Sequence, residues 1–259
     1  MFLTLIDIAT LVIGLLGGAI LASVGIIGPF VLPLLLILGY STDIARGTML
    51  ASELLVTVTS VVAHRRLGNV DKRIVAVYIP GALTVIIGAR VSIEVPVSEM
   101  RLAIGFFEVL MGVLITVMTV RGVPQYKKLD KPFSKGLIQR LIVVSTIAGF
   151  AKGFFGAGWG PIGIGLFILL GLDPILVVGS SLVIRLLLDC SGSLTYISMN
   201  LVDLKALLLL GVPGACSALI GVMVANRISR ETLRMVVGIV VVILGVILIT
   251  QTLAFAVLT

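Results

Sequence analysis

Long apolar stretches separated by short polar breaks run through the whole 259-residue chain. Several of these stretches exceed the roughly 20 residues that a helix needs to cross a hydrocarbon core of about 30 Å. The pattern therefore predicts an all-α, polytopic membrane protein. The predicted segments are 2-24, 29-40, 43-64, 74-93, 98-120, 137-155, 161-171, 174-199, 203-225 and 230-256.

Two of these segments, 29-40 and 161-171, have only about a dozen residues, too few to cross alone as straight helices. Each begins with a proline, which suits a helix start because it lacks the N–H group that would have no partner there. Each follows a glycine break, residues 25-28 in the first case and 156-160 in the second. We expect 8 full transmembrane helices plus two short half-helices, or 8-10 segments depending on whether the short ones cross or fold back.

The second half of the chain repeats the first. At an offset of 132 residues, Gly28-Pro29 matches Gly160-Pro161, Gly47-Thr48 matches Gly179-Ser180, and Val70-Asp71 matches Val202-Asp203. At an offset of 133, Pro80-Gly81 matches Pro213-Gly214, Gly105 matches Gly238 and Gly112 matches Gly245. An ordered series of this length indicates duplication. We predict a first repeat in 1-120, a basic cytoplasmic linker in 121-136 and a second repeat in 137-259.

Basic residues in the breaks predict the orientation, because cytoplasmic loops carry an excess of Lys and Arg. Loops 65-73 and 121-135 are both strongly basic and should be cytoplasmic. In the second half the counterpart of 65-73 is the nearly neutral loop 200-205, whereas the next loop, 226-234, is basic. Equivalent loops thus face opposite sides, which predicts two inverted repeats with both termini extracytoplasmic. Inverted repeats are a recurring plan of secondary transporters.

Composition agrees with a membrane location and excludes several other classes. Hydrophobic residues make up 59% of the chain, charged residues 12%, and the mean hydropathy is +1.27. The net charge of +7 is spread over short loops, so we expect no nucleic-acid partner. Two cysteines and one histidine are too few for a four-ligand zinc site. Without a paired nucleophile and base either, we expect no metal, no cofactor and no enzymatic activity.

The two glycine breaks are candidates for a substrate site. In inverted repeats they would bring two helix starts toward the membrane centre, where free N–H groups and positive dipole ends bind anions. The alternative is that the glycines only permit close helix packing. The predicted substrate-binding residues of the breaks are Gly25, Gly28, Pro29, Phe30, Gly158, Trp159, Gly160, Pro161 and Ile162.

Ionisable residues inside apolar segments cost about 2.5–3.5 kcal/mol each on insertion scales and are therefore functional candidates. We predict that Arg185, with Lys152 as a second candidate, supplies positive charge to the anion site. Glu53, which matches Arg185 at the 132 offset, and Asp189 are predicted to gate the site or to carry a proton. A closed Glu53-Arg185-Asp189 network that only joins the halves is the structural alternative. Glu108 has no obvious partner and is expected to be protonated or to face water. Arginines near segment ends are expected to reach the interface; they are Arg46, Arg90, Arg140 and Arg227.

Several stretches resemble the sulfite exporter TauE/SafE family, over nearly the whole chain. They are His64-Arg65-Arg66-Leu67-Gly68-Asn69-Val70-Asp71, the Pro80-Gly81 turn into Gly88-Ala89-Arg90, and Gly153-Phe154-Phe155-Gly156-Ala157-Gly158-Trp159-Gly160-Pro161. The resemblance implies a bacterial or archaeal inner-membrane permease for sulfite, related sulfur oxyanions or organosulfonates. The first break departs from the family's glycine run at Ile26, Ile27 and Pro29, so we expect two unequal half-sites.

We expect a secondary transporter that exports a small anion by alternating access, since an inside-negative potential favours anion exit by about 2.3 kcal/mol per charge per 100 mV. Import would require coupling, with Glu53 as the expected proton carrier. An anion channel or passive facilitator using the same cavity is the first alternative, and a nontransporting membrane scaffold is the second. The expected partners are the anionic substrate and the lipid bilayer, and the sequence leaves a homodimer open.

Overall fold

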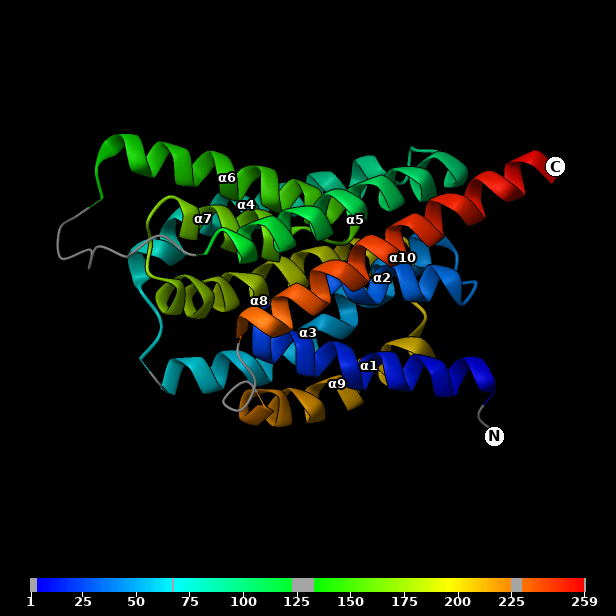
Figure 1. The fold of residues 1–259 in the computed structure, drawn as a ribbon, viewed down its shortest axis with the longest axis horizontal. Coiled ribbons are helices and arrows are strands. Elements are labelled where there is room, and N and C mark those ends of the chain that lie inside the picture. The colour runs from blue at the N-terminus through cyan, green and yellow to red at the C-terminus, as the bar shows by residue number, and fades with distance from the viewer. Residues whose placement is uncertain (1–3, 67, 123–132, 225–229, 259) are drawn as a thin grey trace.

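The computed structural model describes residues 4–66, 68–122, 133–224 and 230–258 (Figure 1). Within these ranges all regular structure is helical. Predicted and observed boundaries differ by only a few residues. The helices are α1 (Leu5–Val24), α2 (Gly28–Ile37), α3 (Thr42–Arg66), α4 (Lys72–Ser92), α5 (Val97–Val120), α6 (Lys135–Phe155), the π-helix η1 (Trp159–Gly165), α7 (Leu166–Leu169), α8 (Pro174–Ser198), α9 (Leu204–Val224) and α10 (Arg230–Leu258).

Among the described residues, 7 helices are long and apolar enough to cross a membrane. They are α1, α3, α4, α5, α6, α8 and α10. Shorter apolar helices occupy Gly28–Ile37, Trp159–Leu169 and Leu204–Leu219. The predicted all-α, multi-pass class is confirmed, and the count of eight full crossings stays a prediction. Most of the predicted basic linker, and the predicted interfacial Arg227, lie outside the described residues.

Glycines in the left-handed conformation end the helices that precede the two short ones. Gly25 ends α1 with φ 78°, and Gly156 ends α6 with φ 81°. A residue with a Cβ rarely adopts this conformation, so glycine at these positions lets each helix stop and the chain turn. In Figure 1 the labels of α2 and α7 lie on opposite sides of the middle of the bundle, and both chain ends lie at the α2 side.

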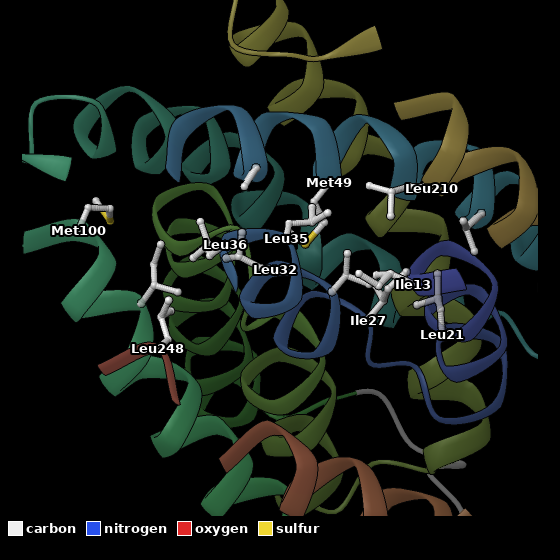
Figure 2. Packing of buried hydrophobic residues seen from close by; sticks show 14 of the residues in the cluster. Ile13, Leu21, Ile27, Leu32, Leu35, Leu36, Met49, Met100, Leu210 and Leu248 are labelled. Carbon is white, nitrogen blue, oxygen red and sulfur yellow. The ribbon is translucent and has the colours of Figure 1, made fainter. Parts of the chain in front are cut away.

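The interior contains two main hydrophobic cores. Each core is built mostly from one half of the chain and includes at least one helix from the other half. The first core joins α1, α2, α3 and α5 with α9 and α10. Figure 2 shows Leu32, Leu35 and Leu36 of α2 grouped beside Met49 of α3, with Leu210 of α9 farther along the same core. The second core joins α6, η1, α7 and α8 with α4. Helix α4 therefore packs against α6 and α8, and α9 packs against α1 and α3.

Contacts between the halves occur in reciprocal pairs. The N–H group of Asp71 donates to Ser180 Oγ at 2.8 Å, and the N–H group of Asp203 donates to Thr48 Oγ1 at 2.9 Å. These four residues form two of the pairs that the sequence matches at the 132 offset. Reciprocal contact, in which i meets j and j meets i, is the signature of a twofold relation.

Helices α5 and α10 cross through contacts that are also reciprocal between the two halves of the chain. A Cβ on Gly112 would lie 2.7 Å from the carbonyl oxygen of Gly238, and a Cβ on Gly245 would lie 2.9 Å from that of Gly105. Gly105 matches Gly238 in sequence and Gly112 matches Gly245, so these contacts are again reciprocal. The inverted duplication remains a prediction, and these contacts support it.

Candidate functional site

The two glycine breaks lie against each other inside the bundle. A Cβ on Gly28 would lie 3.1 Å from the Cα of Ala157, and a Cβ on Gly160 would lie 3.0 Å from the carbonyl oxygen of Gly25. Two backbones approach this closely only where side chains are absent. The structure thus brings together two segments that are more than a hundred residues apart in sequence.

A small cavity lies where the breaks meet. Its volume of about 10 Å³ is the room that roughly one water molecule needs. Among the predicted site residues, Gly25, Phe30, Pro161, Ile162 and Asp189 do not line it. The lining residues are Ile26, Ile27, Gly28, Pro29, Glu53, Lys152, Gly156, Ala157, Gly158, Trp159, Gly160 and Arg185.

Arg185 is a cation of this cavity that has no anionic partner among the described residues. The side chain, on α8, is only 2% exposed. Its Nη2 donates to the carbonyl oxygen of Gly25 at 3.1 Å, whereas Nε and Nη1 have no hydrogen-bond partner in the described part of the chain. Burying an uncompensated charge costs several kcal/mol. The planar fork of a guanidinium binds oxyanions through two parallel hydrogen bonds, so the cavity is suited to an anion.

Lys152, in contrast, is held by two carboxylates. Its Nζ lies 2.5 Å from Glu53 Oε2 and 3.0 Å from Asp189 Oδ1, and all three side chains are buried. Thr57 donates to Asp189 Oδ2 at 2.8 Å. The ion-pair network therefore has Lys152 at its centre, where the structural alternative from sequence had Arg185. Lys152 joins α6 to α3 and α8, and its charge is already compensated.

Trp159 forms one wall of the cavity. It is 1% exposed, its ring centroid lies 4.9 Å from that of Tyr78, and its indole Nε1 has no hydrogen-bond partner among the described residues. It is also the first residue of η1, which follows Gly158 with φ 109°. The first N–H groups of a helix have no partners within the helix. Pro161 has no N–H group, and Ile162 donates to the carbonyl oxygen of Gly158. The indole and the backbone N–H groups of Trp159 and Gly160 are therefore the further donors beside the Arg185 guanidinium.

Arg46 was predicted to reach the membrane interface, and this prediction was wrong. The side chain is 0% exposed. Its guanidinium forms an ion pair with Asp43, and its Nη1 donates to the carbonyl oxygen of Phe154 at 2.5 Å. The last carbonyl groups of a helix need donors from outside the helix. Arg46 satisfies one of them at the end of α6 and so fixes α3 beside the second glycine break.

A second cavity adjoins the first. Its volume by the same measure is about 50 Å³, and it shares Ile26 and Gly160 with the Arg185 cavity. From there it continues toward the end of α5 and the beginning of α10, past Thr119 and Arg234. Ile26 and Gly160 are therefore the wall between the buried site and a recess that leads toward one end of the bundle. We call this second cavity the recess.

Comparison with known proteins gives the family. Residues 10–248 match the family described as Sulfite exporter TauE/SafE. The chain is 33% identical over 172 residues to the Probable membrane transporter protein YtnM of Bacillus subtilis (strain 168), a match that covers 65% of this chain and 56% of YtnM. It is 26% identical over 236 residues to the Probable membrane transporter protein YdhB of the same organism, covering 89% of this chain and 95% of YdhB. The chain therefore belongs to the sulfite exporter TauE/SafE family and is a multi-pass membrane transporter.

Proposed function

We propose that this protein is a secondary transporter that moves sulfite, or a related sulfur oxyanion or organosulfonate, out across a bacterial or archaeal inner membrane. The observation that carries the proposal is the buried Arg185 guanidinium, which lines the cavity between the glycine breaks and has no ion-pair partner among the described residues. The description of the family supports the sulfur-containing substrate class.

The chemistry of the cavity matches the oxygens of such an anion. Two oxygens of a sulfite or sulfonate group would pair with the Arg185 fork, since planar donors and paired oxygens have complementary geometry. The indole N–H group of Trp159 and the first N–H groups of η1 are donors for a third oxygen. Binding at helix starts requires no second lysine or arginine, which is consistent with the engagement of Lys152 by Glu53 and Asp189.

The size of the cavity favours a carrier over a channel. A volume that suits about one water molecule does not admit an anion with three oxygens, so the substrate needs a conformational change to enter and leave. The recess offers the approach from one end, and Ile26 with Gly160 forms the gate between recess and site. Access from the other end would then require the opposite rearrangement, which is alternating access.

Transport by purified protein in proteoliposomes tests the proposal. We expect flux of at least one anion in a panel of sulfite, sulfate, thiosulfate, taurine and sulfoacetate. Arg185→Ala should reduce this flux at least 100-fold, because loss of a charge-assisted bidentate contact costs about 3 kcal/mol. Arg185→Lys keeps the charge without the fork and should be intermediate. Arg90→Ala, which removes the same charge from an exposed position, is the matched control and should transport normally.

Two results would contradict this function. Normal flux through Arg185→Ala would remove Arg185 from the site. A steady conductance in voltage-clamped bilayers, far above the turnover of a carrier, would replace alternating access with a channel.

A further inference from the structure

Glu108 is a buried carboxylate that the transport scheme above does not use. It lies midway along α5 and is 0% exposed. Neither of its carboxylate oxygens has a hydrogen-bond partner, and it takes part in no ion pair, among the described residues. Glu53 and Asp189, by contrast, each have the Lys152 ammonium within 3.0 Å. Glu108 is thus set apart from the carboxylates of the Lys152 network.

The packing of α5 places Glu108 at the level of the glycine breaks. Ile104, one turn before it, belongs to the same core as Leu32 and Leu36 of α2, and Figure 2 shows Met100 of α5 on the Leu36 side of that helix. Ile115, two turns after Glu108, packs with Ile26 of the first break. Residues 104, 108, 111 and 115 share one face of the helix, since they recur at helical spacing.

The neighbouring residue ties Glu108 to the wall of the anion cavity. A Cβ on Gly158 would lie 2.8 Å from Phe107 Cζ, and Gly158 lines the cavity. Phe107 also stacks on Phe155, at the end of α6, with ring centroids 4.1 Å apart. A change in charge at Glu108 would therefore be felt next to the site that holds the anion.

Within the part of the chain that the structure describes, the helices that pack on α5 bring no unpaired buried charge to Glu108. The crossing at Gly105 and Gly112 puts residues 238–245 of α10 opposite it, and all of these are apolar or glycine. The ionisable residues of α10 lie in its first two turns, and α2 and η1 contain none. On α3 and α6 the buried charges are Arg46, Glu53 and Lys152, each in an ion pair. On α5 itself, Arg101 donates to the carbonyl oxygen of Leu36 at 2.9 Å and Glu99 is exposed.

An ionised carboxylate without a partner in such a place costs several kcal/mol, so Glu108 holds a proton when the anion site is loaded and closed. We infer that Glu108 is the proton-binding site of the transporter and that one proton crosses with each anion. This inference rests on the proposed function and adds the proton as a second substrate of the same carrier.

The charges around the anion cavity give a reason for the coupling. Lys152 is compensated by Glu53 and Asp189, so the guanidinium of Arg185 has no anionic partner among the described residues when the site is empty. A bound anion neutralises Arg185, and the loss of this positive charge from the buried region favours retention of the proton on Glu108. On release, the anion and the proton pass to water on the same side. The empty carrier returns with Arg185 charged and Glu108 ionised, and Glu108 takes up a proton on the side where the next anion binds.

Coupling changes what drives transport. With a singly charged anion the loaded step is electroneutral, so the anion gradient and the pH difference set its direction. A doubly charged anion leaves one net charge on which the membrane potential acts. Export then follows a high internal anion concentration.

The test uses the full chain in proteoliposomes with radiolabelled sulfite, and sulfoacetate in parallel, with the potential held at zero. A pH difference of one unit should let the wild type accumulate the anion up to tenfold on the alkaline side, where one proton accompanies each anion. Glu108→Gln should not accumulate the anion, so that its concentration ratio between the two sides stays at about one. This variant should still exchange labelled for unlabelled anion, because exchange moves no net proton. Glu99→Gln, the same change at an exposed position of α5, should behave as the wild type.

The outcomes separate the two proposals. Absence of exchange by the wild type overturns the proposed function and the coupling together. Exchange without pH-driven accumulation in the wild type, or accumulation by Glu108→Gln, overturns the coupling at Glu108. Neither result contradicts the proposed transport function. Loss of accumulation in Glu53→Gln, with normal accumulation in Glu108→Gln, would assign the proton-binding site to Glu53 instead. If Glu108→Gln fails to exchange, Glu108→Asp must restore exchange and accumulation together, since a merely structural role would restore exchange alone.

Discussion

At the scale of single residues, two buried cations that line the same cavity have opposite energetic roles. Lys152 forms ion pairs with Glu53 and Asp189, whereas Arg185 has, among the described residues, only the carbonyl oxygen of Gly25 as a hydrogen-bond partner. Removing the partner of a buried charge is strongly destabilising, and removing a charge that has no partner is not. Substitution of Lys152 should therefore lower stability, whereas substitution of Arg185 should lower transport without lowering stability.

We expect Lys152→Ala to lower the free energy of unfolding by about 3–5 kcal/mol, because it leaves two buried carboxylates without a cation. Arg185→Ala should keep or raise stability while abolishing transport. Thermal unfolding in detergent, followed by size-exclusion chromatography, measures both. Lys135→Ala, at an exposed lysine of the same helix, is the control. Equal stability of Lys152→Ala and the wild type would show that the network contributes nothing to folding.

The sequence indicated which ionisable residues matter at this scale but not which of them touch. The 132 offset relates Glu53 to Arg185 as equivalent positions, and equivalence across a twofold does not require contact. The partner of Glu53 is Lys152, which reaches it because α6 crosses close to α3 and α8. Arg46 was misplaced for a related reason, since position near a segment end does not reveal that a carbonyl group of another helix lies beside it.

At the scale of helices, glycines set the distances between neighbours. A Cβ on Gly149 of α6 would lie 2.5 Å from the Cα of Gly81 of α4, and backbone cannot yield as a flexible side chain does. Hydropathy and proline or glycine punctuation were enough to predict the helices, because each has to span or enter an apolar layer. The π-helical start at Trp159 and the exchange of α4 and α9 between cores depend on tertiary packing, so they had no signal in the sequence.

Gly149→Val should force α4 and α6 apart and destabilise the fold by about 1–3 kcal/mol or more, as overpacking does. Gly136→Val makes the same change near the start of the same helix, where a Cβ would meet nothing within 4 Å, and should be neutral. The melting temperature in detergent compares the two variants. Equal melting temperatures would mean that the helices tolerate a wider separation.

At the scale of the whole molecule, both chain ends lie at one end of the bundle in Figure 1, and the ends of α3 and α5 with the start of α6 lie at the other. Arg65, Arg66 and Arg121 belong to this second end. Because basic residues favour the cytoplasmic side, we expect this end in the cytoplasm and both termini outside. This is the same argument from loop charge that the sequence offered, and the orientation stays a prediction.

Reporter fusions check the orientation. Alkaline phosphatase fused to the C-terminus should be active and green fluorescent protein at the same place dark, since each works on only one side of the membrane. Fusions after Gly122 should show the reverse pattern. A fluorescent C-terminal fusion would invert the assignment and would place the recess on the outer side.

The exchange of α4 and α9 between the two cores has a consequence for how the protein is made and how it arose. Because α4 completes the second core and α9 the first, neither core closes until the ribosome has delivered most of the chain. Helices that are inserted early therefore keep part of their packing surface uncovered until the later helices arrive. A chain cut between residues 122 and 135 should accordingly assemble only when both pieces are synthesised together. The predicted inverted duplication implies a half-length ancestor with the same requirement. Such an ancestor would have worked as a pair of copies inserted in opposite directions, with the fourth helix of each completing the core of the other.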